Sequence, residues 1–276
     1  MAAGPAAKVA LTIAGSDSSA GAGVQADLKT FTALGVYGLN AITCVVAETP
    51  GQVTRIFPIP VDMLREQIRV LFDAFPVAAV KTGLLHSAAL VHEVAEILAT
   101  ERRKQTRRLP IVVDPVMVAT SGALLLQKEA IDTCERELFP LATLLTPNLD
   151  EAGALLGHRI RDVAQMHDAA QRLRQKYGAS VLLKGGHLPG EDATDLLVTA
   201  HGICEFTQPF VRDVSTHGTG CTYSAGIAAG LALGLELEPA IRQAKEFVTR
   251  SINQHFTWQT GAGTRIDALN HSPERP

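Results

Sequence analysis

The residues with the clearest chemical potential are gathered in residues 215–226, which read STHGTGCTYSAG. Gly218 and Gly220 let the backbone turn tightly and bring bare N–H groups close to a ligand. The small and apolar residues 227–233 that follow predict a buried helix. Unpaired N–H groups at a helix start, where the helix dipole is positive, attract anions. A phosphoryl group and the hydroxyl that attacks it could therefore meet here, beside the thiol of Cys221. An ordinary glycine-rich turn before a packed helix would give the same pattern.

Polar residues also follow three apolar runs elsewhere in the chain. Asp114 ends the run IVVD, and Lys184 ends the run VLLK before two glycines. Asn148 and Glu151 stand three residues apart at a helix start, which is typical of a capping box. The functional alternative is that Asn148, Glu151 and Asp114 face a hydrated Mg²⁺, which takes few carboxylates. Lys184 is either a surface lysine before a turn or a point charge for a phosphate.

Strand and helix patterns alternate along most of the chain and would position these residues. The expected strands are residues 8–14, 40–47, 53–59 (an edge strand), 78–81, 111–114, 143–146, 181–184, 195–199 and 205–211. The expected helices are residues 24–34, 62–75 (capped by Asp62), 88–103, 128–138, 150–156, 163–177, 222–234 and 239–257. Residues 15–23 read as a flexible loop, and the sequence from Gln259 as a polar, glycine-rich tail. This order predicts an α/β fold with a mostly parallel sheet and helices on both faces. Ligands bind such sheets at the carboxyl ends of the strands.

Composition limits the classes of function. The 276 residues carry a net charge of −3 and contain one Trp and three Tyr, which argues against a nucleic-acid partner. No apolar run reaches membrane-spanning length without charges or polar breaks, so no membrane partner is expected. The four cysteines form no CxxC pair, and a cytoplasmic location follows as the expectation. We expect one domain over residues 1–276, with residues 1–7 and about 260–276 as flexible tails.

One motif points to a different class of enzyme. Residues 21–26, GAGVQA, match the G-x-G-x-x-A fingerprint of dinucleotide-binding dehydrogenases, and Glu48 lies where a ribose-binding acid is expected. The expected strand ends at Ala14, however, six residues before Gly21, whereas the fingerprint needs its first glycine directly after the strand. A glycine-rich lid or substrate loop is the alternative. The P-loop pattern G-x-x-x-x-G-K-[ST] does not occur in the sequence.

Taken together, the chain resembles the ribokinase-like superfamily and, within it, the hydroxymethylpyrimidine and phosphomethylpyrimidine kinases of thiamin synthesis. The resemblance covers about residues 9–248. The segments that carry it are LTIAGSD, GAGVQADLKTF, LGVYG, VVDPVM, LTPNLDE, LKGGH and THGTGCT. It implies a three-layer sandwich, a homodimer, ATP and Mg²⁺. It also implies two successive phosphoryl transfers, first onto 4-amino-5-hydroxymethyl-2-methylpyrimidine and then onto its monophosphate.

The resemblance also assigns residues to the site. The pyrimidine pocket would be lined by Gly15, Asp27, Val46, Glu48, Leu84, Val116 and Cys221. The nucleotide phosphates and the metal ion would meet Asp114, Asn148, Glu151, Lys184 and the turn of Gly218, Thr219, Gly220 and Cys221. Cys221 stands where the wider superfamily has an aspartate base, and a helix N-terminus can lower the pKa of a thiol enough to make it a base.

One residue departs from the family pattern and leaves the substrate open. The family usually has Gln at the position of Glu48, and an ionised carboxylate can only accept hydrogen bonds. Glu48 would suit an exocyclic amine or a protonated ring nitrogen. Two alternatives remain beside the pyrimidine kinase, namely a pyridoxal or pyridoxine kinase of the same superfamily and a non-catalytic small-molecule sensor. His187 and His217 each lie in an expected active loop.

Overall fold

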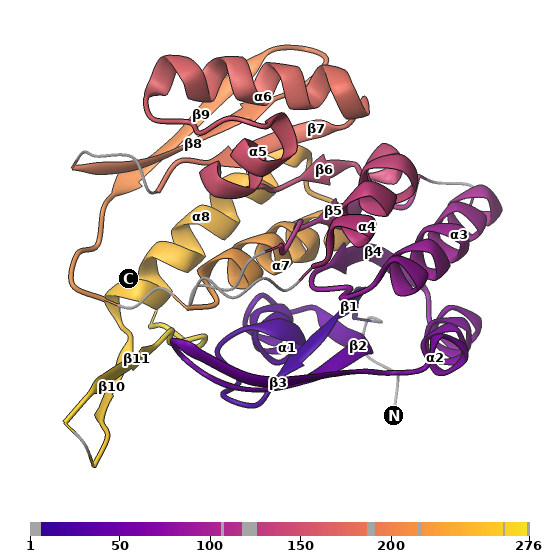
Figure 1. Cartoon of the computed structure of the whole chain (residues 1–276), viewed down its shortest axis with the longest axis horizontal. Coiled ribbons are helices and arrows are strands. Elements are labelled where there is room, and N and C mark those ends of the chain that lie inside the picture. Colours follow the sequence, from indigo (N-terminus) through magenta and orange to yellow (C-terminus); the bar gives the residue numbers. More distant parts are fainter. Residues whose placement is uncertain are drawn as a thin grey trace, which may run out of the picture.

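The protein is built on one nine-stranded sheet (Figure 1). The computed structural model describes residues 7–105, 108–117, 126–186, 191–214, 217–261 and 263–274. The strand order is β3-β2-β1-β4-β5-β6-β7-β8-β9. The six central strands are parallel: β1 (Val9–Asp17), β2 (Tyr37–Thr49), β4 (Val77–Thr82), β5 (Ile111–Val113), β6 (Leu144–Leu145) and β7 (Ser180–Lys184). The mostly parallel sheet expected from the alternating pattern is thus confirmed.

Antiparallel strands close both edges of this sheet. β3 (Gln52–Pro58) pairs with β2 and forms one edge, as expected for a strand that ends in a proline. At the other edge, β8 (Asp192–Val198) pairs with β7, and β9 (Ile203–Pro209) pairs with β8 as a hairpin. The expected hairpin is therefore present.

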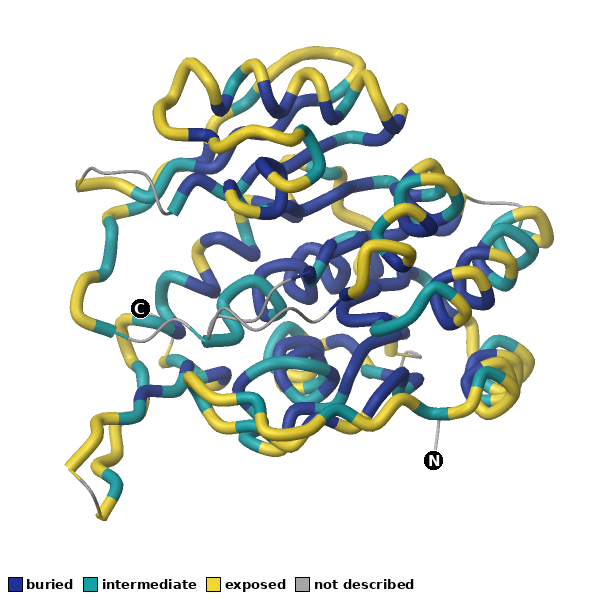
Figure 2. The backbone as a smooth tube through the Cα atoms, in the orientation of Figure 1, coloured by how far each residue is buried: buried dark blue, intermediate teal, exposed yellow. Residues whose placement is uncertain are grey.

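Helices cover both faces of the sheet (Figure 1). One face carries α2 (Val61–Ala74), α3 (Ala88–Lys104), α4 (Lys128–Thr133), α5 (Leu149–Leu156) and α6 (Val163–Tyr177). The other face carries α1 (Gly23–Ala33), α7 (Thr219–Ala232) and α8 (Leu237–Asn253). Successive strand residues point to opposite faces, so in β5 Ile111 and Val113 join the first core and Val112 joins the second. Figure 2 shows these strands and the inward helix faces as buried.

α7 can be buried because most of its side chains are small as well as apolar. A side chain at Gly226 would place its Cβ 2.9 Å from the Cβ of Ala244 in α8, and one at Gly230 would meet Ala240 at the same distance. The two glycines therefore let α7 and α8 pack backbone to backbone. This close packing holds α7 and α8 together on one face of the sheet.

Several element ends differ from the expectation. β1 continues to Asp17, so residues 15–17 of the expected flexible loop are strand, because Ser16 and Asp17 pair with the long β2 after an irregularity at Gly15. Asp62 does not cap α2: Pro60 is the N-cap, and Asp62 lies in the first turn. The expected helix over residues 128–138 leaves the α conformation at Cys134, where a π-helical turn (η1, Cys134–Leu138) and a 3₁₀ turn (η2, Phe139–Leu141) follow.

The C-terminal sequence is more structured than a polar tail. β10 (Phe256–Gln259) and β11 (Arg265–Ala268) pair as a hairpin that projects from the body of the protein (Figure 1). Beyond it, His271 is buried and its Nε2 lies 2.9 Å from the hydroxyl of Thr222 in α7. Burial lowers the pKa of His271 to about 4, so the ring is neutral near pH 7. Among the described residues, no helix is long and apolar enough to cross a membrane.

Candidate active site

The carboxyl ends of the parallel strands meet the N-terminus of α7. Gly218 is the N-cap of that helix and has φ +83°, a conformation that glycine adopts readily. A Cβ on Gly218 would lie 1.8 Å from the carbonyl oxygen of Gly21, so the turn and the loop after β1 are in direct contact. Thr219, Gly220 and Cys221 form the first turn, where backbone N–H groups lack partners within the helix. The predicted glycine turn before a helix is therefore formed, and its binding of an anion stays a prediction.

Lys184 and Asp114 lie directly beside this turn. The Nζ of Lys184 donates to Oδ1 of Asp114 over 3.0 Å, and a Cβ on Gly220 would lie 3.2 Å from that Nζ and 3.7 Å from Oδ2 of Asp114. Three residues from separate parts of the chain thus converge on one point. The hydroxyl of Thr219 is buried and has no hydrogen-bond partner among the described residues. A buried unsatisfied hydroxyl at such a turn is a free donor and acceptor for a bound phosphate.

The charges at this point are mutually stabilising. Burial by itself raises the pKa of Asp114, but the positive charges of Lys184 and Lys81 outweigh burial and hold that pKa below its usual value. Burial opposes the charge of Lys184, and Asp114 and Glu151 reverse that effect, so its pKa is raised. Asp114 also accepts hydrogen bonds from the hydroxyls of Thr146 and Ser224. The lysine is therefore a half-buried positive charge that its bond to Asp114 holds beside this turn.

Asn148 and Glu151 form the capping box of α5. The backbone N–H of Asn148 donates to the Glu151 carboxylate, and that of Glu151 donates to the Asn148 side-chain oxygen, each over 2.8 Å. Burial raises the pKa of Glu151 to about 7, although Lys184 opposes the shift. The capping role is confirmed. A role toward a metal ion stays a prediction, and the oxygen-only set of Asp114 and Glu151 suits a Mg²⁺ ion that keeps most of its waters.

Cys221 lies in the first turn of α7, but its thiol is not acidic. Burial is the largest influence and raises its pKa to about 11, while Lys81 and a hydrogen bond from the N–H of Gly23 only partly oppose it. The expectation that the helix N-terminus lowers this pKa is therefore wrong. A role of Cys221 as the proton acceptor stays a prediction.

The residues expected in the pyrimidine pocket come from several separate elements. Gly15 and Leu84 are neighbours, since a Cβ on Gly15 would lie 3.4 Å from Cδ2 of Leu84. Val46 pairs with Asp17 across β1 and β2, and Glu48 follows it on β2. Val116 is half-buried after β5, where its N–H donates to the carbonyl oxygen of Asp114.

Asp27 is in a different situation from the other residues of the expected pocket. Its side chain is fully buried, and its carboxylate pairs with Lys81 over 2.8 Å and accepts from the hydroxyl of Thr12 over 2.5 Å. The structure thus shows Asp27 in an ion pair within the protein, and contact with a substrate stays a prediction. Lys81 ends an expected strand, where functional residues are expected, but its pairing with Asp27 was not predicted; a lysine inside the apolar run VAAVKT is the signal that it is paired in the core.

The dinucleotide fingerprint is used for another purpose. The Asp17 carboxylate accepts hydrogen bonds from the backbone N–H groups of Gly21 and Ala22, over 3.1 and 2.7 Å. These are loop N–H groups of the kind that bind the pyrophosphate of a dinucleotide when they are free. Here the Asp17 carboxylate already occupies these N–H groups, and its negative charge would repel a pyrophosphate. The loop geometry therefore argues against a dehydrogenase.

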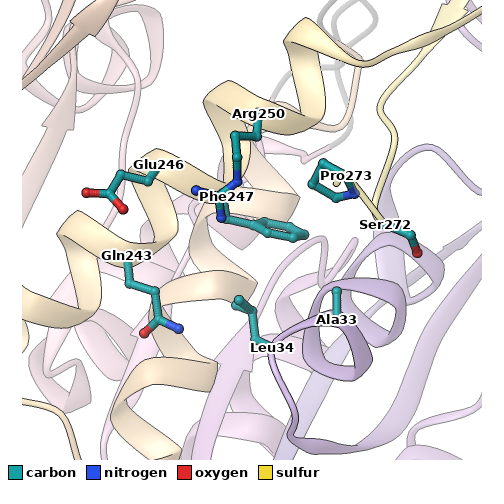
Figure 3. A pocket seen from close by; sticks show the side chains of 8 residues that line it. All are labelled: Ala33, Leu34, Gln243, Glu246, Phe247, Arg250, Ser272 and Pro273. Atoms are coloured by element: carbon teal, nitrogen blue, oxygen red, sulfur yellow. The ribbon is translucent and has the colours of Figure 1, made fainter. Parts of the chain in front are cut away.

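Two hollows lie outside the convergence of Lys184, Asp114 and Gly220. One, of about 560 Å³, is bordered by the end of α1, one side of α8 and residues 272–273 (Figure 3). The other, of about 660 Å³, lies between residues 19–21, the β2–β3 turn and the C-terminal hairpin. His187 and residues 215–216 fall outside the described part of the chain.

Comparison with known proteins identifies the family. Residues 17–265 match the family model described as phosphomethylpyrimidine kinase. This chain belongs to the phosphomethylpyrimidine kinase family. It is 43% identical over 253 residues to the hydroxymethylpyrimidine/phosphomethylpyrimidine kinase of Streptomyces coelicolor, covering 92% of this chain and 91% of the relative. It is also 43% identical over 242 residues to the thiamine biosynthesis bifunctional protein ThiED of Geobacter sulfurreducens, covering 88% of this chain but only 48% of that longer protein.

A solved structure has the same fold as this chain. The pyridoxal kinase of Bacillus subtilis, determined as an ADP complex, superposes with a TM-score of 0.86 at 36% identity, over 97% of this chain and 98% of that one. The ribokinase-like fold expected from the sequence is thus confirmed, and so is the assignment to ATP-dependent kinases. ATP and a small-molecule acceptor are the ligands of this family's reaction.

Proposed function

We propose that the protein phosphorylates 4-amino-5-hydroxymethyl-2-methylpyrimidine with ATP and then phosphorylates the monophosphate to the diphosphate, in thiamin biosynthesis. The observation that carries the proposal is the convergence of Lys184, Asp114 and Gly220 at the start of α7. A fixed positive charge beside free backbone N–H groups offsets the charge that develops on a transferring phosphoryl group. Family membership supports the choice of substrate.

The phosphate side of the site would work mainly by position and charge. The N–H groups of Thr219, Gly220 and Cys221 would hold the transferred phosphoryl, and Lys184 would neutralise it. Asn148 would lie beside the nucleotide, since it forms a parallel bridge with Lys184. Asp114 and Glu151 would hold Mg²⁺ through its water shell, and that ion would neutralise the phosphates further. None of these roles requires a side chain to move a proton.

The direct test follows the second phosphorylation. The protein is incubated with ATP, Mg²⁺ and hydroxymethylpyrimidine monophosphate, and phosphorus NMR of the product is recorded. The proposal predicts the resonances of a pyrimidine diphosphate together with ADP. Appearance of ADP and inorganic phosphate alone, with the monophosphate unchanged, would contradict it.

Glu48 is expected to make substrate binding depend on pH. Burial and the neighbouring charge of Asp17 raise the pKa of Glu48 to about 7, although His217 opposes them. The ionised form accepts from an exocyclic amine, and this form increases as the pH rises through 7. The KM for the pyrimidine should therefore fall about 10-fold between pH 6 and pH 8. Glu48→Gln, which stays uncharged, should lose this slope. An unchanged slope in that variant would remove Glu48 from the pocket.

Cys221→Ala is expected to have a smaller effect than a catalytic base would give. Phosphoryl transfer depends chiefly on positioning and charge, and the raised pKa of Cys221 leaves little thiolate at pH 7. We expect kcat to fall about 10-fold, through lost contact with the acceptor, while the KM for ATP stays within about 3-fold. Cys221→Ser is the matched comparison. A fall of kcat beyond 1000-fold in both variants would restore the thiolate as the proton acceptor.

A second substrate class has a specific observation in its favour. The superposed Bacillus subtilis protein is a pyridoxal kinase, at 36% identity over nearly the whole chain. Pyridoxal phosphorylation is therefore the alternative activity to measure. The sensor hypothesis has less support, because a protein that only binds a small molecule has no use for the charge pair of Lys184 and Asp114 beside the glycine turn.

The wider setting is inferred from weaker signals. We infer one kinase domain in a cytoplasmic homodimer without nucleic-acid or membrane partners. The nine-stranded sheet is continuous from β3 to β9, which supports a single domain. Cys44, Cys134, Cys204 and Cys221 are all free thiols, which supports a reducing compartment.

A further inference from the structure

Asp17 organises the loop that follows β1. One oxygen of its carboxylate accepts from the backbone N–H and the hydroxyl of Ser19, each over 2.7 Å. The other accepts from the N–H groups of Gly21 and Ala22. These bonds, led by those from side chains, outweigh the effect of burial and lower the pKa of Asp17 to about 2. The carboxylate is therefore charged at neutral pH and holds residues 18–22 in one conformation.

His217 joins this loop to the turn that begins α7. Its Nε2 lies 3.1 Å from Oδ2 of Asp17, and the two side chains are 11% and 1% exposed. A Cβ on Gly21 would lie 2.9 Å from Cδ2 of the His217 ring. His217 directly precedes Gly218, whose own missing Cβ faces the Gly21 carbonyl oxygen. The turn and the loop thus touch at two successive residues without room for another side chain.

Glu48 on β2, a residue of the expected substrate pocket, belongs to the same cluster. Ser18 of the loop donates its hydroxyl to the Glu48 carbonyl oxygen over 2.6 Å and accepts from the Glu48 N–H over 2.8 Å. The carboxylates of Glu48 and Asp17 and a ring nitrogen of His217 all lie within 4.8 Å of one another. Burial lowers the pKa of His217, but the bond to Asp17 and the charges of both carboxylates reverse this and raise it. A charged imidazolium between the two carboxylates would offset their repulsion.

A metal ion is an alternative occupant for such a trio. The lone pairs of Asp17 argue against it, because they already accept four hydrogen bonds from the loop and face His217. A metal ion at Asp17 would have to break the contacts that shape the loop. The cluster is better described as a hydrogen-bonded latch between three segments.

We infer that His217 is a positioning residue of the reaction proposed above: bonded to Asp17, it holds residues 18–22 and Glu48 at a set distance from the turn that begins α7. The inference rests on the proposed function and adds a residue that would touch neither phosphate nor metal ion. Its effect is geometric, and a displacement of about 1 Å between reacting groups can lower a rate about 100-fold.

His217→Ala and His217→Gln test the latch. The alanine variant should raise the KM for the pyrimidine and lower kcat, for a combined loss of about 100-fold in kcat/KM, with the KM for ATP within about 3-fold of wild type. The glutamine variant should regain at least 10-fold of this loss, because its amide nitrogen can donate to Asp17 from nearly the position of Nε2. His201→Ala, at the exposed β8–β9 turn, is the matched control and should behave as wild type. Thermal melting of each variant reports its folding.

The outcomes separate the latch from the proposed function. Wild-type protein without turnover of either pyrimidine overturns both. Wild-type turnover with an unimpaired alanine variant, or with alanine and glutamine variants equally impaired at wild-type melting temperature, overturns the latch alone. If the alanine variant does not fold, the double variant Asp17→Asn/His217→Gln and its two single variants replace it. If Asp17 and His217 act as one unit, the double variant should lose no more kcat/KM than the worse single variant. If the losses of the two single variants instead add up in the double variant, the two residues act independently and the latch is contradicted. Calorimetric binding of Zn²⁺ that His217→Gln abolishes would show a metal site instead.

Discussion

Replacing Lys184 with methionine is expected to lower kcat/KM for the pyrimidine about 1000-fold, which corresponds to about 4 kcal/mol of lost transition-state stabilisation. Methionine keeps much of the apolar stem but removes the positive charge that lies beside Gly220. The charge is needed when the transferred phosphoryl group carries its negative charge, so kcat should fall more than the affinity for ATP. Steady-state kinetics at several ATP concentrations measure the two effects separately.

The variant needs a control because Asp114 loses its partner. An unpaired buried carboxylate costs stability, and the pKa of Asp114 should rise toward its usual value once Lys184 is neutral. Lys176→Met removes an ammonium that pairs with Glu135 at the surface and should leave kcat unchanged. Thermal melting shows whether Lys184→Met remains folded at the assay temperature. A folded variant that keeps more than a tenth of wild-type kcat would refute the role given to Lys184.

Gly218→Ala is expected to lower kcat about 100-fold. The new Cβ would fall 1.8 Å from the Gly21 carbonyl oxygen, and φ +83° is unfavourable for alanine. Either the turn or the loop must move, and the backbone N–H groups of α7 would move away from their phosphate-binding position. The measurement is kcat and KM for both substrates, with the melting temperature as the record of stability.

Gly234→Ala separates backbone strain from the collision. Gly234 follows α7 with φ +92°, and a Cβ there would meet nothing within 4 Å. Alanine at this position should cost about 1–2 kcal/mol of stability through the left-handed conformation alone, with kcat unchanged. Equal losses of kcat in Gly218→Ala and Gly234→Ala would mean that backbone strain, and not the contact with Gly21, lowers kcat.

The fold was largely predictable because its signals are local. The apolar runs ending at Asp114 and Lys184, and the periodic helix over residues 163–177, have the pattern of the element that they form. The turn at Gly218 was predictable for the same reason, since glycines before a run of small apolar residues indicate a tight turn at a helix start, although they do not show what the turn binds. Strand ends were less certain: β1 reaches Asp17 because β2 lies beside it, and a pairing of that kind is not written in β1 alone.

The charge pairing within the site depends on contacts between distant residues and could not be predicted. His217 meets Asp17 across 200 positions, and Lys184 meets Asp114 across 70. Local spacing gave the residue types but not their partners. The pKa of Cys221 shows the limit most clearly, because the helix dipole is visible in the sequence, whereas the burial that outweighs it is not.

The central claim is tested most directly by Mg²⁺-dependent release of ADP with hydroxymethylpyrimidine, its monophosphate and pyridoxal supplied separately at equal concentration. The account predicts turnover of both pyrimidines, with a higher kcat/KM than pyridoxal, and loss of that turnover in Lys184→Met. Turnover of pyridoxal alone would contradict the assignment and move the enzyme to vitamin B6 phosphorylation. If no ADP is released with any of the three compounds, the result would contradict a vitamin-precursor kinase of either kind.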